Sequence, residues 1–170
     1  MKSAVASGAF ATSPTRVALA LVAGAASGAA LVTAQWLHAA FQVFGAGFVG
    51  SSGPHGILVV FVGALIAWLA GLMLIGGPAW WLLHRHGLRG WKIAILAGVA
   101  LTFVAALVLA IPLPRSDGSY TAADRGGETI VNNQLTAHGW AEAAEGALLI
   151  SFVGGAVAWV TWRVAYRRAS

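Results

Sequence analysis

Four long apolar blocks alternate with shorter polar connections along the chain. They run from Val17 to about Phe48, from Ile57 to about Leu83, from Ile93 to Ile111 and from about Ala141 to Trp162. A helix needs about 20 mostly apolar residues to cross the hydrocarbon core of a bilayer. The pattern therefore predicts an all-α, polytopic membrane protein built as a bundle of four transmembrane helices.

The residues between the blocks predict where the helices end. Segment 48–56 is rich in glycine and serine and predicts a turn. Gly76-Gly77-Pro78 predicts a kink or an end in the second block, because proline interrupts the helical hydrogen-bond ladder. Prolines at the end of the third block open a loop of residues 112–139. The transmembrane domain is thus predicted over residues 17–168, after a flexible cytoplasmic tail of residues 1–16.

Charge predicts the orientation. All five acidic residues lie in the loop before the last block or at the start of that block, whereas all basic residues except Arg115 and Arg125 lie outside this stretch. Basic residues concentrate on the cytoplasmic side of membrane spans, and tryptophan and tyrosine gather at the interfaces. Trp80, Trp81 and Trp91 accompany the basic connection between the second and third blocks. Both termini are therefore predicted to be cytoplasmic, and segment 112–139 to be outside.

Composition supports a membrane protein and excludes other classes. The chain is 59% hydrophobic and 9% charged, whereas soluble domains carry about 25% charged residues. The net charge of +5 does not predict nucleic-acid binding, because the basic residues flank apolar spans, where the lipid bilayer is their partner. The chain has no cysteine, which excludes disulfides, thiolate metal ligands and cysteine nucleophiles.

The first block has an alternative interpretation. Residues 1–34 have the basic flank, apolar core and small-residue motif Val32-Thr33-Ala34 of a cleaved secretory signal. Apolar sequence continues past Ala34 through Phe44, which favours a retained span. Cleavage would leave the orientation of the other spans unchanged.

Polar residues at the outer ends of two spans are the candidate site. On each span they share one helical face: Gln35, His38 and Gln42 on the first, and His138, Glu142 and Glu145 on the fourth. Polar groups in a membrane normally face protein or water. The hypothesis is that both stripes meet in a hydrated outer cavity that holds a cation or relays protons. The alternatives are interhelical hydrogen bonds for the glutamines and solvated carboxylates in the first turns of a helix.

Small residues form further stripes. Gly24 and Gly28 share a face of the first span, Gly63, Ala67 and Gly71 share a face of the second, and Gly154 and Gly155 lie in the fourth. Small residues let helices approach closely in lipid. The stripes therefore predict packing within the chain or, as an alternative, a seam between copies.

No motif predicts catalysis, a cofactor or a metal. Loop 112–139 has neither an EF-hand pattern nor a phosphate-binding loop. Segment 124–128, with the sequence Asp-Arg-Gly-Gly-Glu, predicts a turn with local charge compensation. No catalytic, cofactor-binding or metal-ligating residue is therefore assigned.

Segment 77–91 combines a Gly-Pro pair, two tryptophans, a His-Arg-His run and Gly-Leu-Arg-Gly-Trp. It resembles a hairpin of small uncharacterised bacterial inner-membrane proteins. The resemblance implies a bacterial, four-span inner-membrane protein and brings no known activity or site.

These observations predict a non-catalytic accessory or scaffold subunit of a membrane complex. The first alternative is a small transporter or channel for protons or cations, which needs several copies because four spans enclose little volume. The second is a membrane enzyme or redox protein. The predicted partners are the lipid bilayer and either further copies of the chain or a larger membrane complex.

Overall fold

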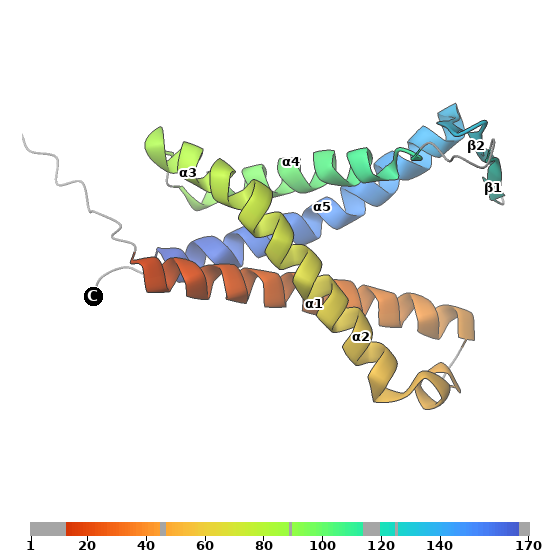
Figure 1. The fold of residues 1–170 in the computed structure, drawn as a ribbon, viewed down its shortest axis with the longest axis horizontal. Coiled ribbons are helices and arrows are strands. Elements are labelled where there is room, and N and C mark those ends of the chain that lie inside the picture. Colours follow the sequence, from red (N-terminus) through yellow and green to blue (C-terminus); the bar gives the residue numbers. More distant parts are fainter. Residues whose placement is uncertain (1–12, 45–46, 89, 114–119, 125, 167–170) are drawn as a thin grey trace, which may run out of the picture. The chain divides into compact units, whose positions relative to one another are not determined.

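The structure is a computed structural model that describes residues 13–44, 47–88, 90–113, 120–124 and 126–166. Its elements, in chain order, are α1 (Pro14–Phe44), α2 (Gly47–Gly71), the π-helix η1 (Leu72–Gly76), α3 (Gly77–Arg85), α4 (Trp91–Ala110), β1 (Ala122–Asp124), β2 (Gly127–Val131), β3 (Gln134–Leu135) and α5 (Ala137–Ala165) (Figure 1).

Four helical stretches are long and apolar enough to cross a membrane. They are Pro14–Val43, His55–Arg85, Trp91–Ala110 and Ala137–Ala165. The predicted class is confirmed: the chain is an all-α, multi-pass membrane protein with four spans. The small sheet β1–β3 is an addition within the predicted outer loop.

The first helix begins earlier than predicted. Residues 1–12 of the predicted tail lie outside the described residues, and α1 starts at Pro14 rather than at Val17. The Ser13 hydroxyl accepts a hydrogen bond from the Arg16 amide at 3.3 Å. Serine before a helix and proline at its first position are a common start signal. The cleavage motif of the alternative, which ends at Ala34, lies inside α1.

The prediction of a turn over residues 48–56 is wrong. This segment belongs to α2, which begins at Gly47. A helix satisfies its backbone hydrogen bonds internally, which matters beside the hydrocarbon core. This gain outweighs the helix penalty of glycine, about 1 kcal/mol per residue. The helix α4 begins at Trp91 and ends at Ala110, within two residues of the predicted third block.

The irregularity predicted at Gly76-Gly77-Pro78 takes the form of η1, a π-helix from Leu72 to Gly76 that leads directly into α3. Proline at the start of α3 has no N–H to donate to the preceding turn. A π-helical turn re-routes the neighbouring hydrogen bonds without ending the helix. The second span therefore continues through the irregularity as far as Arg85.

The chain forms two compact units, Met1–Leu74 with Val157–Ser170, and Ile75–Ala156, each described by itself. In the first unit α1 packs on α2. A Cβ added at Gly28 would lie 2.7 Å from Cδ2 of Trp68, and one added at Gly24 would meet Leu72 Cδ1 at 3.4 Å and the Thr161 side chain. The glycine stripe of α1 is thus filled by neighbouring side chains.

In the second unit α4 packs on α5 in the same way. A Cβ added at Gly154 would lie 2.6 Å from the Thr102 Cβ and 2.8 Å from the Gly98 carbonyl oxygen. At Gly155 it would lie 2.8 Å from Cγ2 of Val99. The prediction that these small residues serve packing within the chain is confirmed for α1 and for α5.

Most of the buried side chains are small, with Tyr166 as an exception, and many of the large apolar side chains are exposed. Buried positions include Ala20, Ala25, Ala29, Ala147 and Val157. Leu74, Leu109 and Phe152 are among the most exposed large side chains. Lipid tails solvate such side chains, so burying them brings little gain, whereas small residues let backbones approach. This distribution fits a protein surrounded by lipid.

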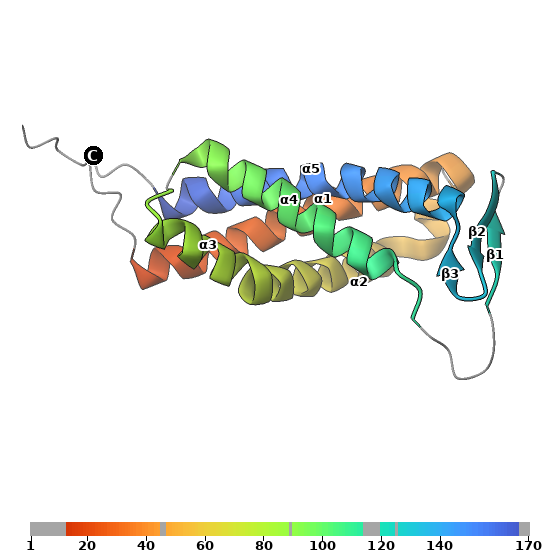
Figure 2. The same cartoon turned by 90° about the horizontal axis from the view of Figure 1, so that it is seen from above.

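The sheet is an antiparallel meander of order β1-β2-β3 beside the N-terminal end of α5 (Figure 2). Val131 pairs with Gln134 across a two-residue turn. The two turn residues, Asn132 and Asn133, have φ of +51° and +63°. Asparagine tolerates this left-handed conformation, which the tight hairpin turn requires. The meander returns the chain directly to the start of α5.

Candidate functional site

Thr136 joins the sheet to α5. Its hydroxyl donates to the Glu128 carbonyl at 2.5 Å and accepts from the Gly139 amide at 3.0 Å. It is therefore the N-cap of α5, and it satisfies an amide that would otherwise lack a partner. A Cβ at Gly139 would lie 2.9 Å from the Thr129 carbonyl carbon, so only glycine allows this approach. The first turn of α5 is thereby placed against β2.

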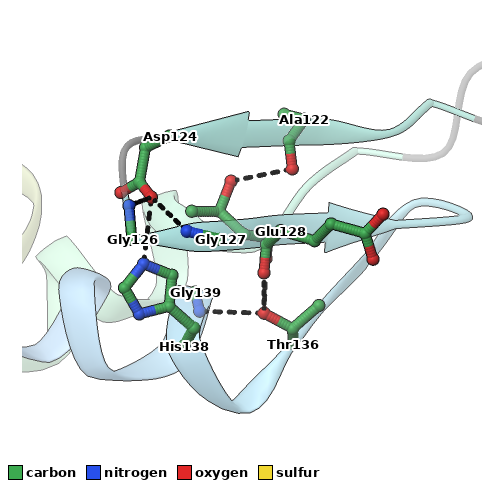
Figure 3. Close-up of polar contacts among 9 residues, drawn as sticks. Ala122, Asp124, Gly126, Gly127, Glu128, Thr136, His138 and Gly139 are labelled. Atoms are coloured by element: carbon green, nitrogen blue, oxygen red, sulfur yellow. Dashed lines mark hydrogen bonds and ion pairs between the residues drawn. The ribbon is translucent and has the colours of Figure 1, made fainter.

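Asp124, the last residue of β1, closes the first hairpin (Figure 3). Its Oδ1 accepts hydrogen bonds from the amides of Gly126 at 2.7 Å and Gly127 at 3.0 Å. Aspartate often caps a turn through its own side chain in this way. The same oxygen lies 3.0 Å from Nε2 of His138. The hairpin therefore points one carboxylate at the first turn of α5.

Gly126 holds the histidine ring in place. A Cβ at this position would lie 2.6 Å from both Cε1 and Nε2 of His138. The backbone of the hairpin therefore packs directly against the nitrogen-bearing edge of the ring. A side chain at this position would require the ring to shift.

Glu142 completes the site one helical turn after His138. Single ligand atoms of Asp124, His138 and Glu142, which we call the Asp–His–Glu cluster, lie within 4.8 Å of one another. Residues four apart on a helix share a face, so His138 and Glu142 approach Asp124 together. The side chains of His138 and Asp124 are 39% and 34% exposed, and Glu142 is exposed. The cluster is open to water and solutes.

Hydrogen bonding from the Glu142 side chain, then from the His138 ring and the Gly126 amide, holds the pKa of Asp124 below its usual range. Asp124 thus releases its proton more readily than an aspartate without these partners. Two carboxyl groups and an imidazole so close together can share a proton or hold a cation. Among the described residues, these three are the acidic and histidine side chains that lie close enough together to hold a metal ion.

The structure assembles part of the predicted site. Two of its six residues, His138 and Glu142, lie in the cluster, whereas Glu145 is exposed one turn further along α5. The other three are exposed on α1, in the other unit: Gln35, His38 and Gln42. The meeting of the two polar stripes in one cavity stays a prediction.

Asp124 is the member that the sequence prediction missed. The sequence places it in a turn with local charge compensation, residues 124–128, of which Arg125 lies outside the described residues. The available signal was the Asn132-Asn133 pair between Val131 and Gln134, which favours a two-residue hairpin. That hairpin joins β2 to β3, and Thr136 then fixes the start of α5 against β2. Because β1 pairs with β2, Asp124 at its end comes close to α5.

Basic and aromatic side chains meet at other helix ends. The guanidinium of Arg85 lies 5.5 Å from the ring centre of Trp81, and Lys92 Nζ lies 5.7 Å from that of Trp91. Arg163 lies 5.5 Å from the ring centre of Trp159. Among the described residues, none of these three cations forms an ion pair with a carboxylate. These ends have the composition of an interfacial belt.

No protein-family model, curated protein or solved structure matches the chain.

Proposed function

We propose that the chain is a non-catalytic accessory or scaffold subunit of a bacterial inner-membrane complex, and that α2 docks on a transmembrane helix of another subunit. One difference supports this. A Cβ at Gly24 or Gly28 of α1, or at Gly154 or Gly155 of α5, would meet neighbouring side chains. A Cβ at Gly63 or Gly71 of α2 would meet no described atom within 4 Å. With Ala67 between them, these residues form an open stripe, the α2 face.

The spacing of the α2 face suits a helix partner. Small residues four apart let two helix backbones approach until dispersion contacts and weak Cα–H···O bonds form. Lipid tails have no oxygen in the hydrocarbon core and therefore cannot accept a Cα–H···O bond. From His55 to Gly71, no residue of α2 is buried. A second helix on this face would cover Gly63 and Ala67, which are exposed.

The charged helix ends support the proposed location. Arg85, Lys92 and Arg163 stack on tryptophans at the ends of three apolar helices. Basic residues beside interfacial aromatics are typical of the cytoplasmic face of bacterial inner-membrane proteins. Both termini of the chain are therefore proposed to be cytoplasmic, with the sheet outside.

The proposal is tested by native mass spectrometry of the tagged chain, extracted from its own membrane in mild detergent. We expect a complex with at least one other subunit. Gly63→Leu and Gly71→Leu should release the partner and leave the stability of the chain unchanged, because the added side chains meet no described atom.

Gly28→Leu is the matched control, because the ring of Trp68 occupies its space. This change should destabilise the chain itself. A complex that survives both substitutions on the α2 face, or a chain that is always recovered alone, would contradict the proposal.

A second candidate is an oligomeric transporter or channel for protons or cations, which the Asp–His–Glu cluster favours because it gathers ionisable groups at one end of a span. The test is ion flux into vesicles that contain the purified chain. Recovery as a homo-oligomer whose flux is lost in Glu142→Gln would support this function over the accessory role. Vesicles that remain tight would exclude it.

A further inference from the structure

We propose that the Asp–His–Glu cluster is a binding site for a divalent transition-metal cation of the zinc and manganese class, held between the first hairpin and α5. The inference is independent of the accessory role, because it concerns the isolated chain. One imidazole nitrogen and two carboxylates are a ligand set that these cations accept.

The spacing of the donors suits a shared cation. Nε2 of His138 and Oδ1 of Asp124 are 3.0 Å apart. Two ligand atoms that each lie about 2.1 Å from one metal, at right angles, are also about 3.0 Å apart. A Glu142 oxygen completes a group within 4.8 Å. Small side-chain rotations would therefore bring all three onto one ion, with water in the remaining positions.

Each donor is positioned by a different feature of the fold. The amides of Gly126 and Gly127 donate hydrogen bonds to Oδ1 of Asp124 and fix its position. The backbone at Gly126 packs against the His138 ring. Glu142 is carried by α5, whose first turn is fixed to β2 through Thr136. Such a frame exists before the metal arrives, so binding does not require the site to fold first.

The charge of the site also favours a cation. Asp124 and Glu142 bring two carboxyl groups into mutual reach, and like charges so close repel unless a proton or a cation lies between them. Among the described residues, no lysine or arginine forms an ion pair with either carboxyl group. At neutral pH a divalent cation balances both negative charges, whereas a single shared proton balances only one.

The site is within reach of dissolved ions. With 29 residues, α5 is about 43 Å long, whereas the hydrocarbon core is about 30 Å thick. Trp159 and Arg163 suit the interface at its C-terminal end. A hydrocarbon core that begins between Trp159 and Arg163 covers about 20 residues of the helix. His138 then lies beyond the hydrocarbon and Glu142 at its edge.

The experiment measures metal on the purified full chain. The protein is isolated in detergent through a tag without histidine, stripped with a chelator and titrated with Zn²⁺ or with Mn²⁺. Bound zinc is counted by elemental analysis after gel filtration, and bound manganese is followed by electron paramagnetic resonance. We expect one zinc per chain and a manganese spectrum that changes on binding.

Glu142→Gln and Glu145→Gln are a matched pair on one face of α5. Glu142→Gln should weaken zinc binding at least tenfold, and Glu145→Gln should leave it unchanged, because Glu145 is outside the cluster. His138→Gln should also lose the metal. Circular dichroism and gel filtration confirm that each variant is folded.

Equal zinc binding by the wild type and Glu142→Gln would overturn the proposal, as would a stripped wild-type chain that takes up no metal. Because no partner is present in this experiment, either result leaves the accessory role to its own test.

Discussion

Charged side chains are treated differently at the sheet end of α5 and at the basic helix ends. At the sheet end, Asp124 receives hydrogen bonds from two backbone amides and from His138. At the basic ends, Arg85 and Lys92 each stack on a tryptophan and, within the described residues, have no carboxylate partner. The charged groups at the sheet end of α5 are therefore paired within the chain. Those at the basic helix ends remain able to interact with lipid headgroups or other surroundings.

The energies explain the difference. An exposed cation–π contact is worth about 0.5–1 kcal/mol, too little to fix a local fold. A basic residue near an anionic membrane surface gains about 1 kcal/mol from the headgroups. The basic ends therefore suit anchoring to a membrane, whereas the sheet end holds a defined geometry through hydrogen bonds and close backbone contacts. Four changes test this contrast, taken from the largest expected effect to the smallest.

Gly139→Val should have the largest effect, because its side chain would meet the backbone of Thr129. Overpacking of this kind costs about 1–3 kcal/mol. We expect faster amide exchange throughout β2 and β3 and a lower unfolding midpoint. Gly146→Val on the same helix is the control, since a Cβ there meets no described atom within 4 Å. Equal effects of the two changes would show that the sheet is not held against α5 at Gly139.

Thr136→Val removes the N-cap hydroxyl and keeps the shape of the side chain. Loss of an N-cap costs about 1 kcal/mol. The amide of Gly139 should exchange faster, while amides in the middle of α5 should not change. Hydrogen exchange measured by mass spectrometry on α5 peptides would detect this. Unchanged exchange at the start of the helix would show that the cap is dispensable.

Acid should loosen the hairpin in a way that depends on Asp124. Its pKa is lowered in the folded chain, so its stabilisation is complete above its ordinary value near 3.8 and is lost as the pH falls further. The effect should be modest, because the side chain is partly exposed. Amide exchange of β1–β2 peptides between about pH 2.5 and 6 should depend on pH less in Asp124→Asn than in the wild type. The same dependence in both proteins would contradict this role.

Arg85→Gln at the basic end should alter stability least, by less than about 0.5 kcal/mol. It should instead weaken the preference for anionic lipid by up to about 1 kcal/mol. Lipid selectivity measured with brominated anionic and zwitterionic lipids, which quench tryptophan fluorescence, would separate the two effects. A large loss of stability without a change in lipid preference would mean that Arg85 supports the fold instead.

The spans were predictable because their signal is local. A run of about 20 apolar residues is sufficient to identify a membrane helix, and this held for the stretches that end at Val43, Arg85, Ala110 and Ala165. The prediction of helix ends was wrong where the turn preference of glycine and serine competes with the tendency of a backbone near the membrane to stay helical. Glycine and serine in segment 48–56 predicted a turn, but the backbone there continues as a helix from Gly47.

Two of the three members of the Asp–His–Glu cluster were predictable from equally local information. His138 and Glu142 share a helical face by spacing alone, and the structure places them in the cluster. Asp124 lies 14 residues before His138, and the spacing of residues on one helix carries no information about that contact. It depends on the turn at Asn132-Asn133, whose positive φ angles reverse the chain.

The sequence by itself determined the number of spans, their apolar surface and the separation of acidic from basic residues, because each follows from the order of side chains along a helix. Only the tertiary structure decided that a three-stranded meander sets β1 against the first turn of α5, and that Gly126 and Gly139 allow the close approach. Contacts between distant residues depend on turn geometry and on the absence of side-chain atoms at those two positions, which hydrophobic periodicity does not record.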